Sequence, residues 1–168
     1  MSSQIGISGS EPGHLEIERK FLPAGESWRG LAPGRPIRQG YLCLDPERTV
    51  RVRISGDRAF LAVKGKNRGA VRIEFEYPIA LPDAEYMLEY LALRPLVEKL
   101  RHCVPFAGLV WEVDEFLGEN SGLVLIEVEL ASADAEFVKP DWAGVEVTGD
   151  TRFYNANLVQ RPFRTFGR

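Results

Sequence analysis

Apolar and polar residues alternate in short runs along most of the chain. The run HLEIERKFL (14–22) places Glu16, Glu18 and Lys20 at every second position, with Ile17 on the opposite parity. Because successive side chains of a strand point to opposite faces, this run predicts a strand with one charged and one apolar side. The same pattern predicts seven further strands, at 38–44, 49–54, 59–65, 70–79, 96–104, 109–116 and 122–130.

Turn residues separate these runs and keep the connections short. SGD (55–57), KNRG (66–69), PFAG (105–108) and GENSG (118–122) predict hairpins, and hence a mostly antiparallel sheet. Helices are predicted at 82–93, 132–138 and 149–160. The pattern indicates one α+β domain over 14–168, preceded by a flexible tail, 1–13, that is rich in Ser and Gly.

The polar side of these strands is ionic. Thr and Ser are nearly absent from it, and sixteen charged residues share this parity or, for Lys66, lie just past a strand end: Glu16, Glu18, Lys20, Arg51, Arg53, Lys64, Lys66, Arg72, Glu74, Glu76, Lys99, Arg101, Glu112, Asp114, Glu127 and Glu129.

Two arrangements can explain one charged side on every strand. For a single strand, the usual explanation is a sheet with one face on the core and one in water. Together, however, the strands segregate like charges, which stand only ~7 Å apart at alternate positions and repel each other until something neutralises them. We therefore expect a closed eight-stranded antiparallel barrel with the ionic side inward and the apolar side outward, covered by the helices.

The balance of charges predicts the ligand of such a tunnel. Eight of the sixteen residues are basic and eight are acidic. Carboxylates are hard oxygen ligands for Mg²⁺ or Mn²⁺, whereas Arg and Lys match phosphate oxygens. A polyphosphate with a bound metal ion would pair with both sets, its phosphates with the basic residues and its metal with the acidic ones.

Overall composition excludes several other classes. A formal net charge of −3 gives no general attraction to nucleic acid. No apolar run reaches the ~20 residues of a membrane helix, and no signal-peptide pattern is present, so we expect a soluble cytoplasmic protein. Cys43 and Cys103 are too few and too far apart to indicate a disulfide framework or a zinc site.

The ordered motifs resemble those of the CYTH domain of the triphosphate tunnel metalloenzymes, most closely the small bacterial members. The family's E-x-E-x-K motif corresponds to Glu16, Glu18 and Lys20. Further matches follow in order along the chain: RQGYL (38–42), RVR (51–53), VKGK (63–66), RIEFEYPI (72–79), VEKLR (97–101), WEVDEF (111–116), LIEVEL (125–130) and GVEVTGDTRFYNANL (144–158).

The resemblance implies an eight-stranded tunnel in which a triphosphate is attacked with the help of a divalent metal. The implied phosphate ligands, with Lys66 added for its place beside the strand, are Lys20, Arg51, Arg53, Lys64, Lys66, Arg72, Lys99 and Arg101. The implied metal ligands are Glu16, Glu18, Glu127 and Glu129, supported by Glu74, Glu76 and Asp114. The metal would be Mg²⁺ or Mn²⁺.

Three residues are candidates for proton transfer. Relatives that hydrolyse triphosphates suggest Tyr41 paired with Lys64, although a Tyr in a strand more often packs. Lys99 is a third candidate, since neighbouring cations lower the pKa of a lysine.

Arg152 and Asn155 of the predicted C-terminal helix could reach the tunnel mouth, but an exposed helix Arg is the commoner outcome.

Three functions remain open at this point. The first is hydrolysis of the terminal phosphate of a triphosphate, above all inorganic tripolyphosphate, because no extra segment for base recognition is left over. The second keeps the site but changes the nucleophile, as in an adenylate cyclase of the CYTH class, or the substrate, as in a thiamine triphosphatase. The third is a non-catalytic polyphosphate- or nucleotide-binding module. The protein would act on a small molecule, with no nucleic acid or membrane partner, as a monomer or homodimer.

Overall fold

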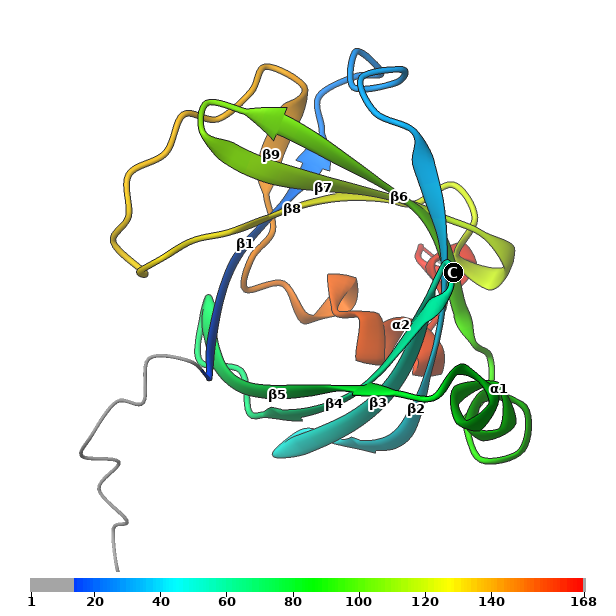
Figure 1. Ribbon diagram of the computed structural model, residues 1–168. Coiled ribbons are helices and arrows are strands. Elements are labelled where there is room, and N and C mark those ends of the chain that lie inside the picture. Colours follow the sequence, from blue (N-terminus) through cyan, green and yellow to red (C-terminus); the bar gives the residue numbers. More distant parts are fainter. Residues whose placement is uncertain (1–13, 168) are drawn as a thin grey trace, which may run out of the picture.

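The computed structural model describes residues 14–167 and is built around a ring of antiparallel strands (Figure 1). Its strands are β1 (Leu15–Pro23), β2 (Gly34–Asp45), β3 (Arg48–Ser55), β4 (Arg58–Gly65), β5 (Val71–Ile79), β6 (Val97–Phe106), β7 (Leu109–Phe116), β8 (Val124–Glu129) and β9 (Ala143–Glu146). The α-helices are α1 (Leu81–Tyr90) and α2 (Asn155–Gln160), and the short 3₁₀ helices are η1 (Gly118–Asn120), η2 (Thr151–Phe153) and η3 (Phe163–Thr165).

Eight of the strands close into the predicted barrel. Neighbours follow the order β5-β4-β3-β2-β6-β7-β8-β1, and β1 also pairs with β5. This closing contact is short, since it consists of the pairs Leu15↔Ile73, Glu16↔Arg72 and Ile17↔Val71. Further along, the same edge of β1 pairs with β9, the ninth strand. The prediction of an eight-stranded antiparallel tunnel is thus confirmed.

Tight turns explain why neighbouring strands form hairpins. Between β6 and β7 lie only Ala107 and Gly108, with φ values of 49° and 81°. Two consecutive residues with positive φ form a turn whose twist matches that of the flanking strands. This turn fixes the register in which Arg101 pairs with Asp114 and Cys103 with Glu112.

The outer face of the ring carries the hydrophobic core. On β3 and β4, Val52, Ile54 and Ala59 are buried under Ala84 and Leu88 of α1. On the opposite side, Trp111 lies in a cluster with other large apolar side chains, among them Phe21, Trp28, Ile126 and Trp142. Because these elements shield it from water, the apolar side of the strands can face outward.

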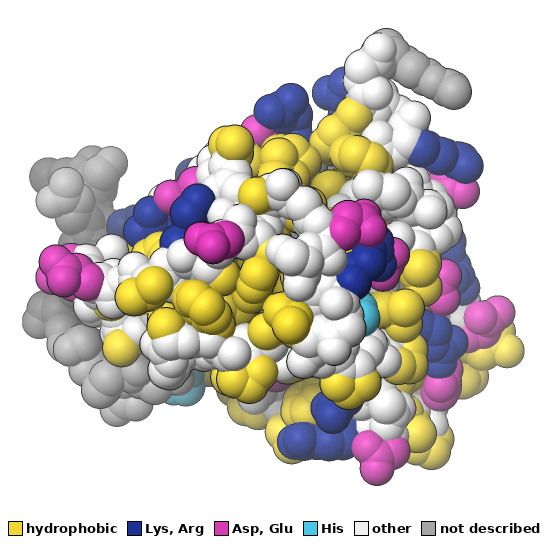
Figure 2. Space-filling view, turned by 90° about the horizontal axis from the view of Figure 1, so that it is seen from above, with side chains coloured by type: hydrophobic (Ala, Val, Ile, Leu, Met, Phe, Trp, Pro, Cys, Tyr) yellow, Lys and Arg dark blue, Asp and Glu magenta, His cyan; other side chains and the backbone are white. Residues whose placement is uncertain are grey.

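The outer cover is incomplete, contrary to the expectation that helices would bury the whole apolar parity. On β4 and β5, Val63 and Ile73 are each 37% exposed and Tyr77 is 54% exposed. On the face seen from above, hydrophobic side chains likewise remain visible among charged ones (Figure 2). Of the two α-helices, only α1 packs on this outer face, over β3 and β4, whereas α2 packs at one end of the lumen.

Two predicted helices differ in the structure. The segment 132–138 is not helical but consists of a bend, a turn and chain without regular secondary structure. Its Phe137 packs beside Trp111 on the outer face, with ring centroids 5.8 Å apart. The segment 149–160 forms η2 and α2, separated by Tyr154, whose backbone is extended (φ −75°, ψ 129°).

Other boundaries were less accurately predicted. The strand β2 begins at Gly34 rather than at residue 38, and β9 was not predicted. The predicted flexible tail, 1–13, lies outside the described residues. Within residues 14–167, no helix has the length and apolar character needed to cross a membrane.

The C-terminal segment closes one end of the ring. In Figure 1, α2 lies within the outline of the strands. Inward-facing Tyr41, Val97 and Phe116 pack there in a cluster with Phe153 and Leu158 of the C-terminal segment. The lumen therefore has an apolar, filled end and a charged remainder.

Candidate active site

The ring encloses a cavity of about 870 Å³. Side chains from the strands and from the segment around α2 line it. Of the sixteen charged residues predicted to share the ionic side, all but Asp114 are among the lining residues. The alternating pattern thus brings together residues that lie more than one hundred positions apart in sequence, such as Lys20 and Glu127.

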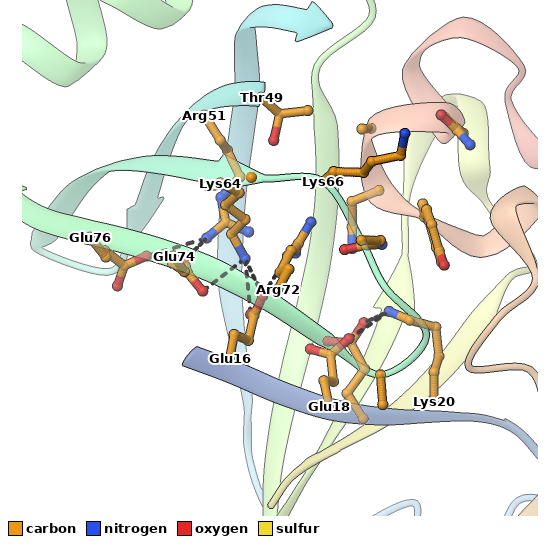
Figure 3. Close-up of a pocket in the computed structure, with 18 of the residues that line it drawn as sticks. Glu16, Glu18, Lys20, Thr49, Arg51, Lys64, Lys66, Arg72, Glu74 and Glu76 are labelled. Atoms are coloured by element: carbon orange, nitrogen blue, oxygen red, sulfur yellow. Dashed lines mark hydrogen bonds and ion pairs between the residues drawn. The ribbon is translucent and has the colours of Figure 1, made fainter. Parts of the chain in front are cut away.

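The first cluster of charges centres on Glu16, which β1 directs toward β4 and β5 (Figure 3). Its carboxylate lies 2.9 Å from Nζ of Lys64 and 2.6 Å from Nε of Arg72. Burial raises the pKa of Glu16, but the positive charges of Lys64 and Arg72 outweigh it and hold this pKa well below its usual value. Glu16 is therefore an anion with two bound cations.

Lys64 is the basic residue of this cluster whose pKa is shifted toward neutral. Its Nζ lies 3.1 Å from Glu74 in addition to the contact with Glu16. Burial and the neighbouring positive charges of Arg51 and Arg72 lower the pKa of Lys64 to about 8, although Glu16 and Glu74 oppose the shift. A lysine with this pKa exchanges its proton near neutral pH.

The second cluster joins β1 to β8. The Lys20 ammonium contacts Glu127 directly and lies 3.1 Å from Glu18, and Arg101 reaches the second oxygen of Glu127 at 3.0 Å. Burial raises the pKa of Glu127, but Lys20 and the neighbouring Lys99 and Arg101 lower it below its usual value. For Glu18, burial and then the negative charge of Glu127 raise the pKa, so two carboxylates here lie close enough to repel.

Asp114 is the most deeply buried of the sixteen predicted ionic residues. It is completely buried, is not among the residues that line the cavity, and accepts hydrogen bonds from Nζ of Lys99 (2.5 Å) and from Nε and Nη2 of Arg101 (2.7 and 2.6 Å). Both of its oxygens are therefore engaged by cations, as are those of Glu127. The role of Asp114 as a supporting metal ligand stays a prediction.

Three further cations of the cavity come from β3 and from the position directly after β4. Arg51 and Arg53 of β3 both pair with Glu76, at 3.3 and 2.9 Å. Lys66 follows β4 and pairs with Glu47 of the β2–β3 turn at 2.6 Å. With more than half of its side chain exposed, Lys66 belongs to the rim rather than to the interior.

Tyr41 also lines the cavity, from β2. Burial raises its pKa, although Arg51, Arg72 and Lys20 oppose the shift. Among the hydrogen bonds of residues 14–167, none joins Tyr41 to Lys64. Tyr41 and Lys64 share the lumen, and their action as a pair stays a prediction.

Sequence reasoning gave too little weight to Asn155. Its Oδ1 accepts a hydrogen bond from Nε2 of Gln39 (3.2 Å) and lies 3.5 Å from Nζ of Lys99. Gln39 shares the parity of Tyr41 on β2, which was the available signal for an inward amide. Arg152, in contrast, is largely exposed and pairs with Asp150, as expected for a surface arginine.

The carboxylates fit a divalent metal by their chemistry. Glu16, Glu18, Glu127 and Glu129 all line the cavity, and Glu18 and Glu129 are directly opposite on paired strands. Carboxylate oxygens are the ligands that Mg²⁺ and Mn²⁺ prefer. Within residues 14–167, however, no three His, Cys, Asp or Glu side chains converge closely enough to hold an ion as they stand.

A charged lumen of this kind inside eight strands matches a known family. The model of the CYTH domain matches residues 14–162. The chain belongs to the CYTH family. This membership confirms the resemblance inferred from the ordered motifs, and it covers nearly the whole described structure.

Two curated relatives carry a functional name. This CYTH protein is 50% identical over 151 residues to an inorganic triphosphatase of Acetivibrio thermocellus, covering 90% of this chain and 97% of the relative. It is 38% identical over 148 residues to an inorganic triphosphatase of Nitrosomonas europaea, covering 86% and 96%.

Solved structures agree with the fold. The crystal structure of an inorganic triphosphatase matches with a TM-score of 0.62 and 37% identity, covering 86% of this chain and 93% of the other. A protein from Bacillus halodurans matches with a TM-score of 0.59 and 14% identity, over 72% and 83% of the two chains. The second likeness shows that the fold persists where most of the sequence has changed.

Proposed function

We propose that this CYTH protein is a divalent-metal-dependent triphosphatase that removes the terminal phosphate of short triphosphates, with inorganic tripolyphosphate as its main substrate. The observation that carries this proposal is a closed lumen in which cations and carboxylates are paired along its walls. Relatives named inorganic triphosphatase, which align with this chain over nearly their whole length, support it.

The phosphate-binding role falls to the cations of the lumen. Phosphoryl transfer depends mainly on neutralising and aligning the phosphates, so a wall of Lys and Arg side chains suits the reaction. We assign this role to Lys20, Arg51, Arg53, Lys64, Lys66, Arg72, Lys99 and Arg101, of which Lys66 acts at the rim.

The metal-binding role falls to Glu16, Glu18, Glu127 and Glu129, with Glu74, Glu76 and the more deeply buried Asp114 in support. Bound Mg²⁺ or Mn²⁺ would neutralise phosphate oxygens and lower the pKa of a water molecule. The expected metal is one of these two ions because the donors are all carboxylates.

Hydrolysis also needs a group that takes a proton from the attacking water. The water oxygen bonds to the terminal phosphorus, the bond from that phosphorus to its bridging oxygen breaks, and orthophosphate and pyrophosphate are released. Lys64 is our first candidate base because its pKa of about 8 leaves part of it neutral near neutral pH. Tyr41, in the same lumen, is its candidate partner. Lys99 is the third candidate, since burial and the positive charge of Arg101 lower its pKa, although Asp114 opposes the shift.

The test is phosphate release from tripolyphosphate, pyrophosphate, ATP and thiamine triphosphate, each with Mg²⁺, Mn²⁺ or a chelator. Turnover of tripolyphosphate that stops with the chelator, with the other compounds much slower, supports the proposal. Cyclic AMP from ATP would indicate a cyclase, faster release from thiamine triphosphate a thiamine triphosphatase, and binding without turnover a non-catalytic module. The cytoplasmic location and a monomeric or homodimeric state stay predictions.

A further inference from the structure

Three of the four carboxylates proposed as leading metal ligands are already bound by cations of the same cavity. Glu16 contacts Lys64 and Arg72, at 2.9 and 2.6 Å. Glu18 lies 3.1 Å from Lys20, and Glu127 contacts Lys20 directly and Arg101 at 3.0 Å. The oxygens that would hold a metal are therefore occupied by internal counter-ions (Figure 3).

These counter-ions are themselves proposed phosphate ligands. Lys20 and Lys64 have side chains only 6% and 5% exposed, so water does little to weaken their attraction to the carboxylates. An ammonium that turns to a phosphate oxygen loosens its contact with the carboxylate, and that carboxylate then needs a new cation. A divalent metal is the cation that the donor set fits.

We propose that triphosphate and divalent metal bind to this lumen as a coupled pair, in which the triphosphate draws Lys20 and Lys64 away from Glu18, Glu127 and Glu16 and so opens these carboxylates to the metal. This inference rests on the proposed function and extends it to the order in which the site is filled. In the triphosphate-free protein, the two lysines act as internal competitors of the metal. By linkage, the metal must strengthen triphosphate binding by the same factor.

The alternative is a preformed metal site that is independent of the phosphates. Such a site needs several carboxylates that point at one ion without a closer cation. Glu129 is the exposed member of the set, and no ion pair is recorded for it among the described residues. The absence of a converging group of three acids within residues 14–167 favours coupling over a preformed site.

The test measures Mn²⁺ binding without triphosphate, by the electron paramagnetic resonance signal of free Mn²⁺. Lys20→Met removes the counter-ion of Glu18 and Glu127, and Lys64→Met removes one counter-ion of Glu16. Each is expected to tighten Mn²⁺ binding by about tenfold, because a competing cation near buried carboxylates is lost. Lys139→Met, an exposed lysine outside the cavity, is the matched control and should leave Mn²⁺ affinity unchanged.

A double variant separates a freed ligand from a simple change of net charge. Lys20→Met combined with Glu85→Gln on α1, outside the cavity, restores the net charge but leaves the released Glu18 and Glu127 in place, so it should keep the gain of Lys20→Met alone. Circular dichroism reports whether each variant folds. Unchanged or weaker Mn²⁺ binding in folded Lys20→Met and Lys64→Met would overturn the proposal.

The wild-type protein supplies a measurement that needs no variant. Sulfate pairs with Lys and Arg but chelates Mn²⁺ weakly, so adding it should tighten Mn²⁺ binding relative to chloride at equal ionic strength. Equal affinity in the two salts would count against coupling. Phosphate release by the wild-type enzyme tests the proposed function separately, so one proposal can fail while the other stands.

Discussion

The inner and outer faces of the ring are made by the same strands but differ in what lies against them. Outside, Trp111 is fully buried, with ring centroids 5.7 Å from Phe21 and 5.8 Å from Trp142. Inside, Lys20 and Lys64 are almost as buried, but their neighbours are carboxylates. Apolar burial stabilises the fold, whereas buried ion pairs add little net stability and can exchange partners. The comparison assigns stability mainly to the outer face and ligand binding to the inner face.

The largest expected effect is on turnover, from a change on the inner face. Glu16→Gln should lower the rate of phosphate release from tripolyphosphate by about a thousandfold, because a charged ligand for the metal is lost. The melting temperature should change little, since Lys64 keeps its ion pair with Glu74 and the freed Arg72 is partly exposed to water. Glu85→Gln on α1, outside the cavity, is the control and should keep full activity. A folded Glu16→Gln enzyme with normal metal-dependent turnover would remove Glu16 from the ligand set.

The opposite result is expected on the outer face. Trp111→Ala should lower the free energy of unfolding by about 3–5 kcal/mol, because it leaves a large cavity among packed aromatic rings. Urea denaturation measures this loss. Val110→Ala, next to it in β7 but more than half exposed, should change stability by less than about 0.5 kcal/mol. Similar losses for both variants would contradict the division between the faces.

Asp114 tests the boundary between the two faces, and its effect depends on pH. Asp114→Asn should cost about 3 kcal/mol of stability at neutral pH, because Lys99 and Arg101 lose a buried anion. The nearby cations hold the pKa of Asp114 below its usual value of 3.8, despite the opposing effect of burial. Its stabilising effect is therefore complete above pH 3.8 and is lost as the pH falls through the lower folded-state pKa.

The measurement for Asp114 is the unfolding free energy of both proteins across acid pH. The gap between wild type and Asp114→Asn should close only below about pH 4, in line with the direction of the pKa shift. A gap that closed instead near pH 6 would mean that another group controls this region. Glu115→Gln, in the partly exposed ion pair with Arg29, is a suitable control with a much smaller effect.

The smallest expected effect concerns substrate capture by one inner cation. Arg53→Ala should raise the KM for tripolyphosphate by about tenfold and change kcat little, because it removes one phosphate contact among several. Arg58→Ala, in the same hairpin but not among the cavity-lining residues, is the matched control. A large fall in kcat with an unchanged KM would place Arg53 at the transition state instead.

The strands could be predicted from the sequence because the alternation of polar and apolar residues along each strand specifies both the inner and the outer face of the ring. Glu16, Glu18 and Lys20 share a parity, and the same rule placed fifteen of the sixteen ionic residues at the cavity. Asp114 shows the limit of that rule. The alternation predicts on which side of the strand Asp114 lies. It does not predict how deeply this side chain is buried, which depends on its cross-strand partner Arg101.

Segments outside the strands were harder to predict. The region 132–138 was predicted to be helical, but it lacks regular secondary structure and Phe137 packs against Trp111, so that tertiary contacts override the local preference. Asn155 reaches Lys99 only because the chain breaks at Tyr154 between η2 and α2. Such contacts depend on how distant parts of the chain meet, which a single sequence does not encode in a local pattern.

The short seam between β1 and β5 has a consequence for how the ring assembles. β1 is the earliest strand described, yet its partners β5, β8 and β9 come much later along the chain. Contacts between such distant segments form slowly, because closing the long loop between them costs entropy before the contacts can stabilise the chain. We therefore expect β2 to β4, joined by hairpins, to form early, and β1 to dock last, so that the carboxylates of its E-x-E-x-K motif enter the lumen in the final step of folding.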